Sequence, residues 1–219
     1  MPNQTFFNLP ENKRQAIIDC AIAEFAAHDY DIASISNIVK QAKIAKGSFY
    51  QYFENKKDLY LYLIGLASQT KTAFLRQAKA PKADADFFGH LRWLFSMGIQ
   101  FKLRYPALNQ ITNRLTFGDI PFREEVLQKT REATSDYLLD LVIRGQQQGD
   151  VDADLDPYLA VYAIQSLSSG LTDLIPQRLG KEADLLVSSF PADVNTEALE
   201  HIFDDVIRVL KRGIGSSNT

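Results

Sequence analysis

The chain has 219 residues, of which 46% are hydrophobic and 23% are charged, and its formal net charge is −3. These proportions are typical of a globular protein with a packed core, and the negative total excludes general attraction of the whole molecule to nucleic acid. The lone Cys20 excludes an internal disulfide framework and a cysteine metal cluster. The N-terminus lacks the order of a secretory signal, and no apolar run approaches the roughly 20 residues of a membrane span. We therefore expect a cytoplasmic protein without membrane, metal or cofactor.

Helical periodicity dominates the chain, and no segment shows the sustained alternation of a strand. In the first helical segment, apolar residues from Ile18 to Phe25 fall at i, i+3, i+4 and i+7, which is one face of a helix. Capping residues, prolines and glycines indicate where the helices begin and end. In chain order, the predicted helices cover about residues 8–28, 34–42, 46–53, 55–78, 84–104, 107–116, 121–148, 155–179 and 195–212.

A change of composition at residues 79–86 divides the chain. This stretch combines Pro81 with small polar residues, as linkers and loops do. The sequence therefore predicts an all-α protein with a three-helix N-terminal domain over 8–56, a bridging helix over 57–78 and a larger C-terminal helical domain over 79–213.

The segment "KIAKGSFYQYFENKKDL", residues 43–59, combines aromatic rings with lysines. On a helix, Phe49 and Phe53 share one face, and we expect them in the core. The opposite face carries Gly47, Ser48 and Gln51, flanked by Lys46, Tyr50 and Tyr52. The two tyrosines have two interpretations: they contact a ligand, or they are amphipathic surface rings with hydrated hydroxyls.

Charge is concentrated in the same region. Residues 34–57 hold five lysines and one acidic residue, Glu54, a net charge of +4 in a chain that totals −3. Such a run alone is typical of a solvated face. Here it coincides with two short helices separated by a short break, which is the size of a helix-turn-helix. In that motif the second helix enters the major groove of DNA, so the segment predicts DNA binding.

The stretch "SISNIVKQAKIAKGSFYQYFENKKDL" resembles the DNA-binding segment of the tetracycline-repressor (TetR) family of bacterial regulators, and the resemblance covers about residues 10–65. The rest of the chain resembles the family in length and helical content. The positions in register with the family pattern are Ser34, Ile35, Ile38, Val39, Ala42, Ile44, Lys46, Gly47, Ser48, Phe49, Tyr50, Tyr52, Phe53, Lys56 and Leu59.

The resemblance implies roles for single residues. The implied DNA contacts are phosphate contacts by Ser34, Tyr50 and Lys56, base contacts by Lys46, Ser48 and Tyr52, and variable contacts by Ser36 and Gln51. Gly47 would let the backbone approach the groove closely.

The turn departs from the family pattern at two positions. Lys43 stands where the family usually has glycine, and Ala45 stands where it usually has a serine or threonine cap. A lysine in the left-handed conformation costs about 1 kcal/mol or more, and a lost cap costs roughly 0.5–2 kcal/mol. Either the turn is built differently, or Lys43 accepts that cost and reaches phosphate.

The family joins its DNA-binding domain to a helical domain that dimerises and often binds a small effector. The residues expected at a dimer interface are Ser166, Ser169, Gly170, Leu199, Ile202, Phe203 and Val206, with the core of the same chain as the alternative. The residues that would line an effector pocket are Trp93, Phe101, Arg104, Tyr105, Arg114, Phe117, Tyr158 and Tyr162. The alternative for this second set is core aromatics and surface arginines.

The resemblance implies a bacterial transcription regulator, most simply a homodimeric repressor that a small molecule releases from a palindromic operator. A constitutive DNA-binding regulator without an effector is one alternative, and an all-helical enzyme is another. The three histidines are isolated, and the chain has no zinc-protease, P-loop or nucleophile-elbow motif, which argues against the enzyme. A ligand-dependent shift in melting temperature would separate the regulated protein from the constitutive one.

Overall fold

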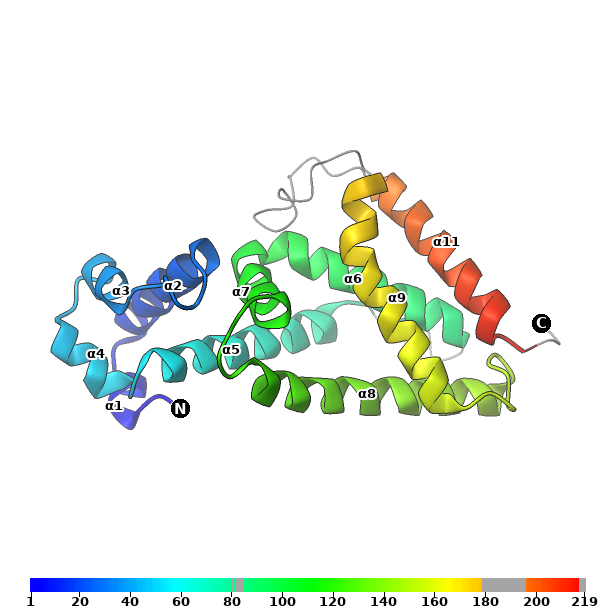
Figure 1. Cartoon of the computed structure of the whole chain (residues 1–219), viewed down its shortest axis with the longest axis horizontal. Helices are drawn as coiled ribbons and strands as arrows, with labels where there is room; N and C mark the ends of the chain where they lie inside the picture. Colours follow the sequence, from blue (N-terminus) through cyan, green and yellow to red (C-terminus); the bar gives the residue numbers. More distant parts are fainter. Residues whose placement is uncertain (80, 82–84, 179–195, 217–219) are drawn as a thin grey trace. The chain divides into compact units, whose positions relative to one another are not determined.

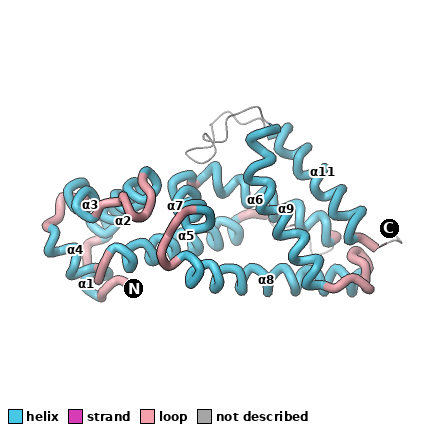
Figure 2. The backbone as a smooth tube through the Cα atoms, in the orientation of Figure 1, coloured by secondary structure: helices cyan, strands magenta, loops and turns pink. Residues whose placement is uncertain are grey.

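The structure is a computed structural model that describes residues 1–79, 81, 85–178 and 196–216 (Figure 1). In this part of the chain every regular element is a helix (Figure 2), and a single antiparallel bridge joins Val151 to Gly215. The predicted all-α class is therefore confirmed. The helices are α1 (Gln4–Phe7), α2 (Glu11–Ala27), α3 (Ile35–Gln41), α4 (Lys46–Tyr52), α5 (Lys56–Gln77), α6 (Phe87–Arg104), α7 (Pro106–Phe117), α8 (Arg123–Gln148), α9 (Pro157–Arg178) and α11 (Thr196–Ile214).

The start of the chain differs from the prediction. The helix predicted from about residue 8 begins later, because Asn8 ends a short helix, α1, that the sequence did not predict. Helix α2 begins at Glu11 with Pro10 in the N-cap position and no side-chain cap. The missed helix is one turn long, too short to show a period, and its buried Phe6 is its only apolar anchor.

The chain packs as two compact units, one formed by Met1–Phe74 with Tyr105–Arg123 and the other by Leu75–Arg104 with Glu124–Thr219. The first unit thus contains α7, which lies in the chain between two helices of the second. The predicted domains, 8–56 and 79–213, are divisions along the sequence and stay a prediction. The predicted linker at 79–86 lies partly outside the described residues.

The first unit has a core that α1–α5 and α7 share. Ile17, Phe25 and Phe49 have no exposed surface, and α2 packs against both α3 and α7. Tyr60 of α5 is 1% exposed, and its hydroxyl donates to the backbone oxygen of Ile111 on α7 at 3.0 Å. Burial raises the pKa of this phenol, so it stays a hydrogen-bond donor. The helices of the unit therefore share one apolar core and a buried hydrogen bond.

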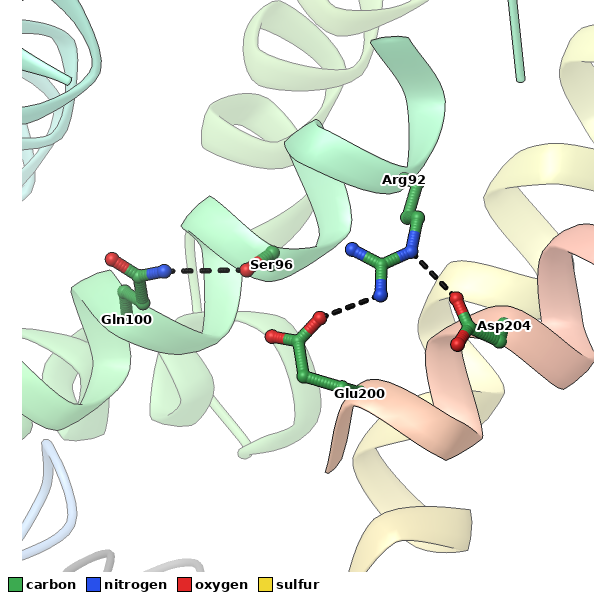
Figure 3. A network of polar contacts seen from close by, with 5 residues as sticks. All are labelled: Arg92, Ser96, Gln100, Glu200 and Asp204. Carbon is green, nitrogen blue, oxygen red and sulfur yellow. Dashed lines mark hydrogen bonds and ion pairs between the residues drawn. The ribbon is translucent and has the colours of Figure 1, made fainter. Parts of the chain in front are cut away.

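The second unit encloses a separate core between α6, α8, α9 and α11. At its surface Arg92 of α6 bridges two acids on α11, with Nη2 to Glu200 at 2.7 Å and Nε to Asp204 at 2.6 Å (Figure 3). The hydrogen bond from Arg92 holds the pKa of the Asp204 carboxyl below its usual value. This contact therefore stabilises the unit at neutral pH, and its contribution is lost as acidification protonates Asp204.

Candidate nucleic-acid interface

The turn between α3 and α4 has a defined hydrogen-bond pattern. The N–H of Ile44 donates to the oxygen of Val39 at 3.0 Å, and the N–H of Lys43 donates to the oxygen of Lys40 at 3.3 Å. These are the two bonds of a Schellman motif, in which the first residue after the helix C-cap adopts the left-handed conformation. Lys43 is that residue, with φ 54°. Of the two predicted alternatives, the structure therefore shows the lysine in the left-handed conformation.

Replacing Lys43 with glycine is expected to stabilise the first unit by about 0.5–1 kcal/mol. Relief of the left-handed strain, about 1–2 kcal/mol, exceeds the extra backbone entropy that glycine loses on folding, about 0.5–1 kcal/mol. Urea unfolding monitored by circular dichroism measures the change. Lys40→Gly is the matched control, because Lys40 is helical and the same substitution should there destabilise by about 0.5–1 kcal/mol. Destabilisation by both would contradict the strain at Lys43.

Helix α4 has one buried face and one exposed face. Phe49, with no exposed surface, lies on the buried face, and Phe53 directly after the helix is equally buried, as predicted. Tyr50 is 50% exposed, Ser48 is half-buried, and the side chains of Lys46 and Gln51 are exposed. The helix thus presents a cation, a hydroxyl, an amide and an aromatic ring to its surroundings.

Gly47 adds open space to the exposed face of α4. A methyl group built at this position would meet no atom within 4 Å. The packing of the protein itself therefore does not require glycine there.

Tyr52 corrects one expectation. It is 5% exposed and its ring lies 6.1 Å from that of Phe6, so the prediction that both tyrosines flank an exposed face is wrong for Tyr52. The reason is tertiary: helix α1 covers the side of α4 that carries this ring. The sequence did not predict α1 and therefore left that side open.

Both short helices lack a side-chain N-cap, which was expected at Ala45 of α4 but is unusual for a serine such as Ser34 of α3. Ser34 occupies the N-cap position of α3 but makes no side-chain cap hydrogen bond, and Ala45 of α4 makes none either. The carboxylate of Glu24, 5% exposed on α2, instead accepts the N–H of Ser34 at 2.8 Å and the side-chain amide of Asn37 at 3.3 Å. Glu24 therefore fixes the start of α3 from a neighbouring helix, a role that the sequence did not reveal.

Lys56 has a different role from the one that the resemblance implied. Its ammonium donates to the backbone oxygens of Tyr30 at 2.6 Å, Asp31 at 3.2 Å and Ala33 at 3.2 Å, and it lies 4.6 Å from the centre of the Tyr30 ring. An ammonium has three donors, and all three are used here. We therefore assign Lys56 to holding the turn between α2 and α3, and not to a phosphate contact.

Replacing Lys56 with methionine should lower the free energy of unfolding by about 1–3 kcal/mol, because three carbonyl oxygens lose a charged donor. It should leave the salt dependence of DNA binding unchanged. Lys46→Met is the matched control, since it removes an exposed cation and should alter DNA binding with little effect on stability. A flatter salt dependence for the Lys56 variant would restore the phosphate role.

Helix α1 supports the C-terminal end of α4. The N–H of Asn3 donates to the oxygen of Tyr52 at 2.8 Å, and its side-chain amide donates to the oxygen of Gln51 at 3.2 Å. Phe6 is fully buried, with its ring 4.7 Å from that of Phe53. These contacts satisfy two of the last carbonyls of α4, which the helix leaves without partners.

The residues expected to line an effector pocket are distributed over the two units. Tyr105, Arg114 and Phe117 belong to the first unit and the others to the second. Phe117, Tyr158 and Tyr162 are 66%, 70% and 68% exposed, and Arg104 is also exposed, so within their own units these four side chains are not enclosed, and their place in an effector pocket stays a prediction. Sequence periodicity does not reveal this exposure, because it depends on whether segments distant in sequence pack against these side chains.

The other predicted pocket residues have neighbours of their own. Phe101 is buried, the Trp93 ring lies 5.6 Å from that of His90, and the Tyr105 ring lies 6.3 Å from that of Phe74. Arg114 contacts the end of α2. Their role in effector binding stays a prediction.

The predicted dimer residues fall into two groups. Leu199, Phe203 and Val206 are at most 8% exposed in the core of the second unit, and Ile202 packs against it, so the alternative of intrachain core holds for α11. These side chains face α6 and α9, and a partner cannot reach them. Ser166, Ser169 and Gly170 of α9, in contrast, are exposed.

Two short helices joined by a Schellman turn, with a polar and basic exposed face on the second, define a helix-turn-helix DNA-binding protein. The family profile described as "Bacterial regulatory proteins, tetR family" matches residues 17–63, and the one described as "Tetracyclin repressor-like, C-terminal domain" matches residues 85–215. The chain belongs to the tetracycline-repressor family of transcriptional regulators.

Solved and curated relatives agree with this assignment. The crystal structure of a TetR family transcriptional regulator from Chloroflexus aurantiacus J-10-FL is 40% identical, with a TM-score of 0.80, over 98% of this chain and 99% of that one. The probable acrEF/envCD operon repressor of Escherichia coli K12 is 26% identical over 86% of this chain and 91% of its own length. Within the described ranges, no helix is long and apolar enough to cross a membrane.

Proposed function

We propose that this regulator is a dimeric repressor whose α4 enters the major groove of a palindromic operator. The observation that carries the proposal is that α4 has two different faces. Its aromatic face is buried, while Lys46, Ser48 and Gln51 lie on the opposite face, within the basic segment of residues 34–57. Lys46 and Ser48 would meet base edges, with Gln51 and Ser36 as variable contacts. The open space at Gly47 suits close approach of a DNA backbone.

The phosphate contacts would come from Ser34, Lys43 and Tyr50. The hydroxyl of Ser34 makes no cap bond, and the side chains of Lys43 and Tyr50 are exposed. Each is therefore available to an oxygen of the DNA backbone. Tyr52 and Lys56 are left out of this proposed interface, because one is buried and the other is bound to carbonyl oxygens.

The dimer would form through the exposed face of α9. This face carries Tyr158, Leu159, Tyr162, Ser166, Ser169 and Gly170, all exposed. The sequence of α9 has no charged residue before Asp173, which is unusual for a solvated helix face and typical of an interface core. The α3–α4 helix-turn-helix of each subunit, here called the reading head, would contact one half-site, and the two half-sites would lie about 34 Å apart.

A small-molecule effector would release the protein from DNA. One relative supports a ligand, the A-factor receptor protein of Streptomyces griseus, 27% identical over 78% of this chain and 57% of its own length. The fold is also that of the transcriptional regulator FadR of Bacillus subtilis, whose crystal structure contains stearoyl-CoA. The latter is 22% identical with a TM-score of 0.64, so it shows the fold alone. A constitutive regulator without an effector is the second candidate.

A footprint on the DNA upstream of the protein's own gene, repeated across a salt series, tests the proposal. A protected site with two-fold symmetry and steep salt dependence is the expected result. A protected site without symmetry would contradict the dimeric reader. Melting curves with acyl-CoA esters separate the two candidates, because an effector that binds the native state raises its melting temperature.

A further inference from the structure

The turn of residues 28–34 joins α2 to the helix-turn-helix, and two cations hold it from two different helices. Lys56 of α5 binds three of its carbonyl oxygens, as described above. Arg114 of α7 pairs through Nη1 with the carboxylate of Asp29, and its Nη2 donates to the oxygen of Ala26 at 3.2 Å. Ala26 lies in the last turn of α2, where carbonyl groups without helical partners favour a cation.

The Arg114 side chain is held in place at a cost. It is 20% exposed, and its Nε is buried without a hydrogen-bond acceptor among the described residues. Burial also lowers the pKa of this guanidinium. A long side chain on the surface would turn to hydrate all its donors, so the packing of α7 against α2 fixes this one.

The clamped turn leads directly into the reading head. The backbone oxygen of Asp29 accepts the N–H groups of Ile32 at 3.0 Å and Ala33 at 2.9 Å. The next residue, Ser34, is fixed to α2 through Glu24. The end of α2, the turn and the start of α3 therefore form one hydrogen-bonded assembly, and a displacement of Asp29 or Ala26 moves the start of α3.

Helix α7 is also the part of the first unit whose chain continues into the second unit at both ends. A single residue, Tyr105, separates the end of α6 from the start of α7, and α8 begins at Arg123. The backbone therefore connects both ends of α7 directly to the second unit.

We propose that Arg114 is the positioning residue through which α7 sets the orientation of the reading head. The proposal rests on the proposed function, since orientation matters only for a protein that reads two half-sites. A shift of α7 would pull the turn through Asp29 and Ala26, rotate α3 and α4, and change the half-site spacing that the dimer fits.

The test compares affinities for operators whose half-sites are moved apart or together by one base pair. Arg114→Met should reduce the preference of the wild type for its own spacing about fivefold or more, the lower end of allosteric couplings. The salt dependence should stay unchanged, because no phosphate contact is lost. Asp29→Asn, on a carboxylate that is 70% exposed, should give the same relaxation without risk to folding.

Arg144→Met is the matched control. Arg144 pairs with Asp140 at 3.0 Å on α8, and both side chains are more than half exposed. This variant should keep the spacing preference. If Arg114→Met and Asp29→Asn lower the melting temperature but keep the full preference, Arg114 is only structural and the proposal fails. If the wild type itself binds no spacing better than random DNA, the proposed function fails instead.

Discussion

Replacing Lys46 with alanine is expected to weaken operator binding by about 1–3 kcal/mol per reading head and to relax base preference at one position of each half-site. Lys46 opens the first turn of α4, its side chain is exposed, and a lysine there would reach base edges as the helix enters the groove. Fluorescence anisotropy with operators mutated one base pair at a time measures both effects.

The control for Lys46 is Lys79→Ala, an exposed lysine outside the reading head. It removes the same charge from the protein and should leave base preference unchanged. An equal loss of affinity on every operator variant, with a flatter salt dependence, would show that Lys46 contacts phosphate. Unchanged binding of the Lys46 variant would remove α4 from the interface altogether.

Phe6→Ala should lower the free energy of unfolding by about 3–5 kcal/mol, the usual cost of removing a buried phenylalanine. Phe6 has no exposed surface, and its ring lies within 6.1 Å of those of Phe53, Tyr52 and Tyr62, centre to centre. Its loss would leave a cavity between α1, α4 and α5. Urea unfolding followed by circular dichroism gives the change, and DNA affinity should fall as α4 loses its support.

The neighbouring ring provides the control for Phe6. Phe7 is 42% exposed, so Phe7→Ala removes the same atoms from the same short helix and should cost about 0.5 kcal/mol. Equal losses for the two variants would mean that α1 contributes by its overall hydrophobicity. A negligible loss for Phe6→Ala would mean that the helix does not stabilise the reading head.

The sequence by itself determined the class of protein, because local signals carry it. Helical periodicity and caps placed nine helices close to where the structure has them, and one predicted cap shows why. The helix predicted over about residues 55–78 starts at Asn55, whose side chain accepts the N–H of Asp58 at 2.9 Å, as an N-cap does. The division of α4 into a buried and an exposed face was also correct at Phe49 and Tyr50. These features depend on residues within one or two helical turns of each other.

Only the tertiary structure decided what the long side chains do. Lys56 and Arg114 each bind groups more than 20 residues away, and α1, at the start of the chain, packs against α4 and buries Tyr52. A lysine that binds phosphate and one that binds carbonyl oxygens have the same spacing in the sequence, because both sit at the start of a helix. The role of each ammonium group depends on which acceptors lie within hydrogen-bond distance, and packing between distant segments decides that.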